Sequence, residues 1–246
     1  MTMETEEGET EEGRLAGRLA LVTGASRGIG AAVARRFAAE GAQVILTART
    51  VGGLEEVDDQ IRQAGGKPAT LVPLDLRDFD KIDALGASLF ERFGKLDVLV
   101  GNAAILGTLS PLAHGDPQTW QAVIDVNLTA NFRLIRSLDP LLRRSEAGRA
   151  IFVTSGAAAR PIPYWGTYAT SKTALEMLVG TYAAETAKTN VRVNLVDPGV
   201  VRTIMRAQAF PGEDPESLTP PEAITEAFVE LASAECTRRG ETLAAG

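Results

Sequence analysis

The chain has 246 residues, of which 45% are apolar, so it can bury a core in one large α/β domain or in two smaller ones. No apolar run approaches the ~18 to 20 residues that a membrane span needs, and we expect no membrane partner. A single cysteine, Cys236, excludes an internal disulfide and a cysteine metal cluster. A single histidine, His114, excludes a multi-histidine metal site, so no metal is expected.

Negative charge is concentrated in residues 1–13, MTMETEEGETEEG, which hold six glutamates and no basic residue. Without these six, 25 basic residues face 26 acidic ones, so the remainder is close to neutral and no nucleic-acid surface is predicted. The stretch has neither the apolar core of a signal peptide nor the arginines of a transit peptide. We therefore expect a disordered acidic tail over 1–13, one domain over 14–246 and a cytoplasmic protein.

A glycine-rich turn is expected between the first strand and the first helix. Residues 18–23 (RLALVT) form an apolar run typical of a buried strand, and residues 31–41 (AAVARRFAAEG) have helical periodicity. The intervening GASRGIG, at 24–30, would let backbone N–H groups approach a pyrophosphate at the helix N-terminus. Its G-x-x-x-G-x-G spacing differs from the commoner G-x-G-x-x-G fingerprint, and alone it could be a packing turn. Its position between strand and helix favours a dinucleotide site.

The end of the second expected strand, residues 43–47, bears on the choice of cofactor. A carboxylate near this point takes the ribose hydroxyls of NAD, whereas an arginine accommodates the 2′-phosphate of NADP. This chain has Ala48 followed by Arg49 there, and Arg27 lies in the glycine-rich turn. Two guanidinium groups could bracket a phosphate, although each could equally be a solvated side chain. We expect NADP(H) to be preferred and NAD(H) to be possible.

The rest of the chain alternates strands with helices. Further strands are expected over 69–74, 96–100, 149–154 and 191–196, with a brief seventh over 240–244. Helices are expected over 53–64, 79–93, 119–142, about 166–188 and 220–234, with a short helix and loop over 200–219. The long helix is expected to be interrupted or to end near Pro140, and Asn127 within it to be solvated. One doubly wound parallel sheet of the α/β class is predicted, a three-layer Rossmann fold of six to seven strands.

Residues 155–172, SGAAARPIPYWGTYATSK, hold the candidate catalytic groups. Tyr168 and Lys172 would lie one turn apart on one face of a helix. An ammonium there favours phenolate over phenol and would lower a pKa that is ~10 in an unperturbed tyrosine. Tyr168 could then exchange a proton with a substrate oxygen to which Ser155 also donates a hydrogen bond. The spacing alone is common on helix surfaces, so the other motifs must decide.

The motifs resemble, in order and spacing, those of the single-domain branch of the short-chain dehydrogenase/reductase family. The resemblance covers roughly residues 18–231 and rests on TGASRGIG at 23–30, Asp75, Asn102-Ala103, Asn127, Ser155, Tyr168-x-x-x-Lys172 and Pro198-Gly199. Two features depart from the family pattern. GNAA at 101–104 replaces the usual Asn-Asn-Ala-Gly, and the closing TRRGETLAAG leaves one of the family's common dimer contacts open.

The resemblance implies a role for each matched residue. Tyr168 would be the general acid/base, and Lys172 would lower its pKa and hold the nicotinamide ribose. Ser155 would polarise the substrate carbonyl, and Asn127 would hold a water that connects Lys172 to solvent. The dinucleotide would be held by Gly24, Ser26, Arg27, Gly28, Ile29, Gly30, Arg49, Asp75, Leu76, Asn102, Ala103, Pro198, Gly199, Val201 and Thr203, together with Tyr168 and Lys172. We expect the substrate to meet Ile105, Leu106, Ser155, Pro163, Trp165, Tyr168, Met205 and Phe210.

These observations predict an NAD(P)-dependent oxidoreductase that prefers NADPH and moves hydride between the nicotinamide and a carbonyl or secondary alcohol carbon. Its partner would be a small, mostly apolar molecule. The alternative is a dinucleotide-binding regulatory or structural protein without turnover, which has no physical need for a tuned tyrosine. Helices around 119–137 and 166–188 are expected to form an isologous interface, giving a homodimer or homotetramer.

Overall fold

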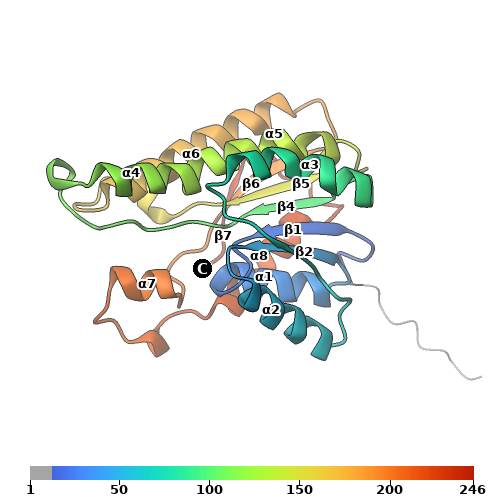
Figure 1. Ribbon diagram of the computed structural model, residues 1–246, viewed down its shortest axis with the longest axis horizontal. Coiled ribbons are helices and arrows are strands. Elements are labelled where there is room, and N and C mark those ends of the chain that lie inside the picture. The colour runs from blue at the N-terminus through green and yellow to red at the C-terminus, as the bar shows by residue number, and fades with distance from the viewer. Residues whose placement is uncertain (1–12) are drawn as a thin grey trace, which may run out of the picture.

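The computed structural model describes residues 13–246, so the tail expected over 1–13 lies outside the described residues apart from Gly13. Within this range, the strands form one parallel sheet of seven in the order β3-β2-β1-β4-β5-β6-β7 (Figure 1). The strands are β1 (Leu19–Thr23), β2 (Gln43–Ala48), β3 (Thr70–Pro73), β4 (Val98–Gly101), β5 (Arg149–Val153), β6 (Arg192–Asp197) and β7 (Thr242–Ala244). The doubly wound parallel sheet and its brief seventh strand are confirmed.

Two layers of helices cover the sheet (Figure 1). One face carries α1 (Gly28–Ala39), α2 (Val51–Gln63) and α8 (Thr225–Ala232); the other carries α3 (Phe79–Phe93), α4 (Pro117–Ile124), α5 (Ala130–Leu142) and α6 (Gly166–Glu185). In β1, Ala20 and Val22 enter the first core while Leu19 and Leu21 enter the second. Side chains alternate along a strand, so a sheet covered on both faces needs the continuous apolar run that the sequence shows. No helix within 13–246 has the length and apolar character needed to cross a membrane.

The long helix expected over 119–142 is divided, but at a different place. A π-helical turn, Asp125–Thr129, separates α4 from α5, and α5 continues through Pro140 to Leu142. Pro140 is exposed, so the carbonyl that loses its N–H partner there can be hydrated, and the helix tolerates the residue near its end. The helix is therefore not interrupted at Pro140, but it ends two residues later, so the expected end near Pro140 is confirmed. Asn127 lies inside the π-helical turn and is fully buried, so its expected solvation is wrong.

A buried arginine fixes the segment that follows α8. Arg149, at the start of β5, is buried and donates hydrogen bonds to the backbone carbonyls of Ser233, Ala234 and Cys236. Burial lowers the pKa of Arg149 to about 10, so the guanidinium stays charged at neutral pH. Ser233 caps α8 and the other two residues follow it, so the guanidinium holds the backbone at and just beyond the end of the helix. The helix expected over 220–234 is shorter, a 3₁₀ turn over Pro221–Ile224 followed by α8.

Candidate active site

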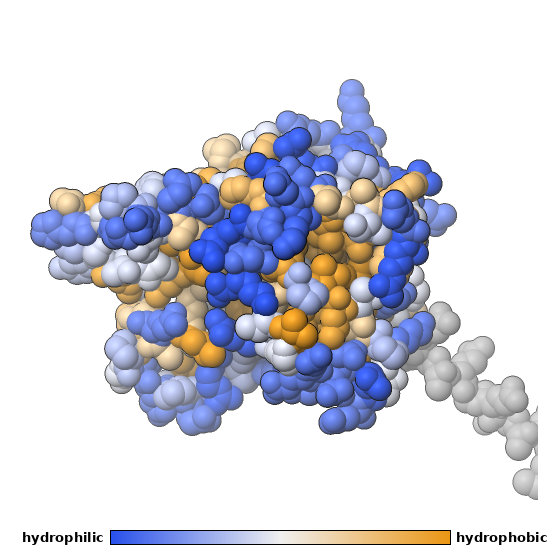
Figure 2. Space-filling view, viewed as in Figure 1, coloured by the Kyte–Doolittle hydropathy of each residue, from blue (hydrophilic) through white to orange (hydrophobic). Residues whose placement is uncertain are grey.

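A cavity of about 1030 Å³ opens at the carboxyl ends of the strands. It begins at the ends of β2 and β3, passes the turn before α1, and reaches α7 (Ile204–Ala209), which stands apart from both helix layers (Figure 1). Figure 2 shows the surface hollowed between α7 and the α4 end of the upper layer. The strand order reverses between β1 and β4, which is where ligands of open α/β sheets bind.

The glycine-rich turn is shaped for close approach of a ligand to the backbone. Gly24 and Gly28 have φ angles of 66° and 56°, in the left-handed region that favours glycine. A side chain at Gly30 would overlap the carbonyl of Gly24. Helix α1 begins here with no side-chain cap from Arg27, so its first N–H groups are free to meet an anion in the cavity.

Hydrogen bonds tie this turn to the end of β4. Asn102 donates from its side-chain Nδ2 to the carbonyl of Thr23 at 2.9 Å. The hydroxyl of Thr23 accepts from the backbone N–H groups of Asn102 and Ala103, each at 3.0 Å. Asn102 therefore holds the protein together at the cavity floor in addition to lining the cavity. Thr23 was not among the residues expected to form the site. Its position at the end of a buried strand, next to the glycine-rich turn, was the signal that could have identified it.

Three guanidinium groups gather where β2 and β3 end. Arg27 and Arg49 are exposed and line the cavity. Arg77, which the sequence analysis did not single out, also lines it and pairs with Asp75 at 2.9 Å. Hydrogen bonds from Arg77, with the charge of Arg49 adding to them, hold the pKa of Asp75 below its usual value. This end of the cavity is therefore positively charged and keeps Asp75 ionised.

The candidate catalytic residues meet midway along the cavity. Tyr168 and Lys172 lie on α6, with 7% and 2% of their surface exposed, and Ser155 directly follows β5 and the buried Thr154. The Lys172 ammonium donates to the carbonyl of Val153 at 2.8 Å and lies 5.8 Å from the centre of the Tyr168 ring. The expected trio of Ser155, Tyr168 and Lys172 thus shares one wall of the cavity.

Burial controls how these groups titrate. Burial raises the pKa of Tyr168 to about 12, and the charge of Asp197 adds to this rise. A hydrogen bond with the Ser155 hydroxyl acts in the opposite direction and lowers the same pKa. Burial also lowers the pKa of Lys172 to about 8, against the opposing effect of Glu176. The expected lowering of the Tyr168 pKa by Lys172 is therefore wrong for the protein by itself. A spacing of four residues indicates a neighbouring charge but not the burial of the phenol, which has the largest effect on its pKa.

Asn127 holds the wall behind Tyr168. Its Oδ1 accepts from the backbone N–H of Ile105 at 2.9 Å, and its Nδ2 donates to the Ile105 carbonyl and to the Ser171 hydroxyl, both at 3.0 Å. The Ser171 hydroxyl donates in turn to the carbonyl of Tyr168 at 2.7 Å. The side chain of Asn127 therefore joins the loop after β4 to the second turn of α6. Ser171, fully buried, is a third residue that was not expected from the sequence, after Thr23 and Arg77.

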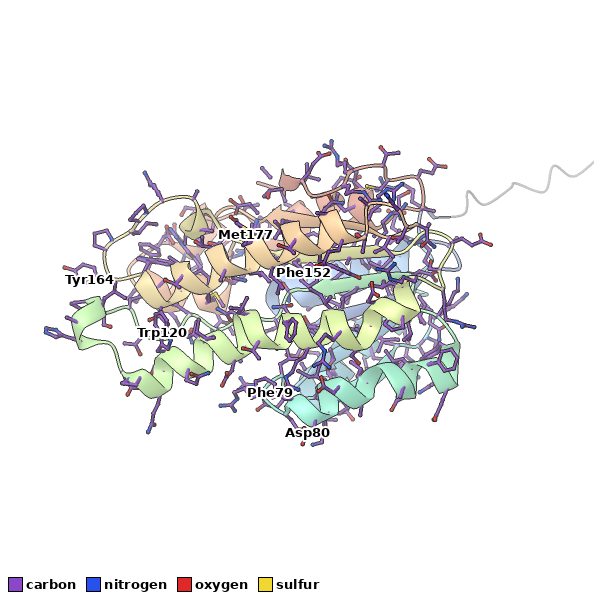
Figure 3. All side chains as sticks on the ribbon, turned by 90° about the horizontal axis from the view of Figure 1, so that it is seen from above. Phe79, Asp80, Trp120, Phe152, Tyr164 and Met177 are labelled. Carbon is purple, nitrogen blue, oxygen red and sulfur yellow. The ribbon has the colours of Figure 1, made fainter. Side chains whose placement is uncertain are left out.

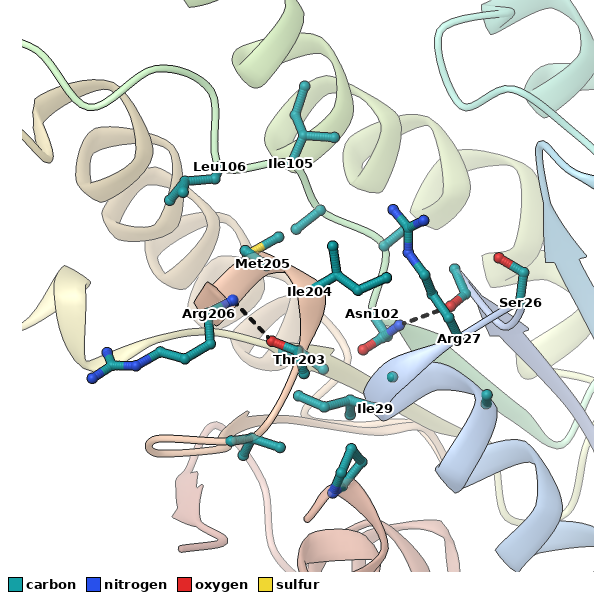
Figure 4. A pocket seen from close by; sticks show the side chains of 18 of the residues that line it. Ser26, Arg27, Ile29, Asn102, Ile105, Leu106, Thr203, Ile204, Met205 and Arg206 are labelled. Carbon is teal, nitrogen blue, oxygen red and sulfur yellow. Dashed lines mark hydrogen bonds between the residues drawn. The ribbon is translucent and has the colours of Figure 1, made fainter. Parts of the chain in front are cut away.

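The opposite end of the cavity is apolar. Ile105, Leu106 and Met205 line it (Figure 4). Trp165 lines it as well, and its ring meets that of Tyr168 edge-on with 6.0 Å between the ring centres. Of the residues expected to meet the substrate, Pro163 and Phe210 do not line the cavity, and Pro163 is exposed. The others line the cavity, and their contact with a substrate stays a prediction.

The segment around α7 is pinned in place. Thr203 caps α7 by accepting from the N–H of Arg206 at 3.1 Å (Figure 4). Arg206 pairs with Glu213 and stacks 3.8 Å from the centre of the Phe210 ring, and that ring lies 5.8 Å from the ring of Trp165. These contacts position α7 over the apolar end of the cavity.

A family model described as short chain dehydrogenase matches residues 18–214. The chain belongs to the short-chain dehydrogenase family. The oxidoreductase YciK of Escherichia coli K12 is 37% identical over 90% of this chain and 88% of its own. The 3beta-hydroxysteroid dehydrogenase 1 of Eggerthella lenta is 39% identical over 82% of this chain and 77% of its own. A short chain dehydrogenase of Escherichia coli CFT073, crystallised with NADPH, matches with a TM-score of 0.92 and 36% identity, over 96% of this chain and 99% of that one.

Membership confirms the predicted family and makes this chain an oxidoreductase of the short-chain dehydrogenase type. Of the residues expected to hold a dinucleotide, all except Gly30 line the cavity, and Gly30 lies buried directly behind Gly24. Asn127 lies behind the wall rather than in it, because its side chain is occupied by Ile105 and Ser171. The cavity therefore collects nearly the whole set that short-chain dehydrogenase motifs indicated.

Proposed function

We propose that this short-chain dehydrogenase reduces the carbonyl group of small, mostly apolar compounds with NADPH and catalyses the reverse oxidation of secondary alcohols. One observation carries the proposal. Ser155, Tyr168 and Lys172 meet at one wall of a cavity that is apolar at one end and rich in arginine at the other. A neighbour with 36% identity and the same fold was crystallised with NADPH, which supports the same cofactor here.

The residues present fit such a cofactor. The uncapped N-terminus of α1 and the glycine-rich turn would take the pyrophosphate. Arg27 and Arg49 would take the 2′-phosphate, and Asp75 and Leu76 would border the adenine. Lys172 would hold the nicotinamide ribose, and Pro198, Gly199, Val201 and Thr203 would border the nicotinamide, since they line the cavity between the glycine-rich turn and α7.

The bound cofactor supplies the hydride that the carbonyl carbon receives. Tyr168 gives its proton to the carbonyl oxygen, which becomes the alcohol hydroxyl, and Ser155 donates a hydrogen bond to that oxygen. With a pKa near 12, the phenol of Tyr168 is fully protonated at neutral pH and suits the reductive direction. Lys172 then passes a proton to the phenolate left behind, because its pKa of about 8 is below that of Tyr168. We propose that a water beside Asn127 returns a proton to Lys172.

Replacing both Ala48 and Arg49, as Ala48→Asp with Arg49→Ala, should reverse the cofactor preference. A hydrogen bond to a charged group contributes ~1.5 to 3 kcal/mol, and exposure of both arginines favours the lower value. Since ~1.4 kcal/mol is a factor of ten, we expect the wild type to bind NADPH roughly tenfold more tightly than NADH. Dissociation constants at two salt concentrations test this, with Arg62→Ala, an exposed change on α2 away from the cavity, as the control. Equal affinities, or a preference that salt does not weaken, would mean that these arginines do not bind phosphate.

We also propose a homodimer formed through the layer of α4, α5 and α6, extending to a homotetramer by a further contact. Large apolar side chains are exposed on these helices, among them Phe132 and the pair Trp120 and Met177 that Figure 3 labels. Met177 has 74% of its surface exposed. The spacing of Ala174, Leu178, Tyr182 and Glu185 suggests one face of α6 for this contact, but Tyr182 is buried and donates a hydrogen bond to Asp139 of α5, so it is not available to a partner. A monomer in light scattering at micromolar concentration would contradict the dimer.

A further inference from the structure

A short hydrogen bond joins β5 to α6 next to the catalytic residues. Thr154 directly precedes Ser155, is 2% exposed, and donates from its hydroxyl to Oε1 of Glu176 at 2.6 Å. Its backbone N–H donates to the carbonyl of Val196 at 2.9 Å, so both ends of the residue are held. Glu176 lies one turn after Lys172 on α6. A hydrogen bond to a carboxylate is among the stronger ones in proteins.

This bond completes a set of three contacts between the end of β5 and one face of α6. Lys172 donates to the carbonyl of Val153, Glu176 accepts from Thr154, and Ser155 lies beside Tyr168. The helix residues Tyr168, Lys172 and Glu176 are spaced by four, so they form one row along the helix. The first two belong to the catalytic group. Glu176 is the third member of the row and has no part in the chemistry itself.

Glu176 also places a negative charge next to a buried cation. Burial lowers the pKa of Lys172 to about 8, and the charge of Glu176 acts against this. The other elements around Lys172 bring different groups. The segment after β5 offers the hydroxyls of Thr154 and Ser155, the π-helical turn offers the neutral Asn127, and Asp197 at the end of β6 acts on Tyr168. Glu176 is thus the anion that bears directly on Lys172.

We propose that Glu176 is a positioning residue for catalysis: through Thr154 it locks Ser155 in register with Tyr168, and through its charge it keeps Lys172 in the ammonium form. The inference rests on the proposed function only in assigning Ser155, Tyr168 and Lys172 to the reaction. The two contributions can be separated by substitution. Glu176→Gln keeps an oxygen that accepts from Thr154 but removes the charge, whereas Thr154→Val keeps the charge but removes the hydrogen bond.

Two further variants serve as controls. Thr154→Ser restores the hydroxyl that Thr154→Val removes, and it keeps the test decisive if the valine variant fails to fold. Glu185→Gln makes the same chemical change as Glu176→Gln at an exposed position near the end of α6. Thirteen residues of rise separate Glu185 from Lys172, about 20 Å, so its charge is screened.

The charge is tested without turnover, by NMR of protein labelled with ¹³C at the lysine Cε. The chain has five lysines, and the Lys172 resonance is identified by its loss in Lys172→Met. In the wild type it should titrate with a pKa of about 8. In Glu176→Gln we expect the midpoint to fall by roughly one pH unit, the lower end of the effect of a close opposite charge. An unchanged midpoint in Glu176→Gln, or an equal fall in Glu185→Gln, would overturn the electrostatic role, whether or not the enzyme reduces any carbonyl.

The lock is tested by kinetics against pH. Thr154→Val should lower kcat about tenfold at every pH with little change in KM for NADPH, because Ser155 shifts while the cofactor site is kept. Thr154→Ser should restore most of that loss. NADPH binding should weaken as the pH rises and Lys172 loses its proton. In Glu176→Gln this weakening should begin at a lower pH than in the wild type, because the pKa of Lys172 is lower. A lower free energy of unfolding in Thr154→Val would show that the hydrogen bond was lost. If that variant nevertheless keeps the wild-type kcat, the positioning role is overturned.

Discussion

Replacing Tyr168 by phenylalanine should lower kcat by ~10²- to 10⁴-fold while NADPH affinity stays within a few-fold, because the change deletes one hydroxyl from the proton transfer and leaves the ring. The ring is buried against Trp165, so the phenyl group retains the packing. Steady-state turnover and the dissociation constant for NADPH, measured on the same preparations, separate the two effects.

Tyr164→Phe is the matched control for this change. Tyr164 lies only four residues earlier, but its side chain is exposed and outside the cavity. It should leave both turnover and NADPH affinity unchanged. Near-normal kcat in Tyr168→Phe would remove Tyr168 from the reaction, and loss of NADPH binding in that variant would indicate a structural role instead.

Replacing Lys172 by methionine should abolish turnover, weaken NADPH binding and stabilise the protein at neutral pH. The pKa of Lys172 is about 8 in the folded protein and ~10.4 in an unfolded chain. A difference of about two and a half units corresponds to ~3 kcal/mol at ~1.36 kcal/mol per unit, and this cost is fully present below pH 8. Loss of the hydrogen bond to Val153 destabilises the variant by ~1 kcal/mol and so offsets part of this gain. We expect a net gain of ~1 to 2 kcal/mol in the free energy of unfolding at pH 7.

The pH dependence gives this prediction its sign. Between pH 8 and ~10.4 the unfolded chain binds the lysine proton and the folded protein does not, so wild-type stability gains from rising pH. The advantage of Lys172→Met should therefore vanish by about pH 10.4. Urea unfolding at pH 7 and pH 10 checks both points, with Lys188→Met, an exposed lysine just beyond α6, as the control. Destabilisation at pH 7 would show that Lys172 is not a desolvated cation.

The sheet and much of the cavity could be predicted because their signals are local. The apolar run RLALVT requires burial on both faces, and the spacing of glycines in GASRGIG requires a turn where no side chain fits. The spacing of Tyr168 and Lys172 is likewise a property of one helix. Each of these is determined by residues close together in the chain, so pattern and position are sufficient.

Other features depend on contacts between distant residues and left no local signal. The π-helical turn is centred on Asn127, whose partners are Ile105 and Ser171, 22 and 44 residues away. The pairing of Thr154 with Glu176 depends on how α6 lies against β5, which neither segment reveals alone. The pKa of Tyr168 rises because tertiary packing buries the hydroxyl, and that packing is not visible in a four-residue spacing.

The most direct test of the proposed chemistry is to follow the hydride itself. NADPH carrying deuterium at the transferable position of nicotinamide C4 is mixed with the wild type and a panel of apolar ketones, and the alcohol products are examined by mass spectrometry. We expect the alcohol to carry one deuterium on the former carbonyl carbon with wild type and with Tyr164→Phe, and essentially no alcohol with Tyr168→Phe. Alcohol formed without deuterium, or formed equally well by Tyr168→Phe, would contradict hydride transfer assisted by Tyr168.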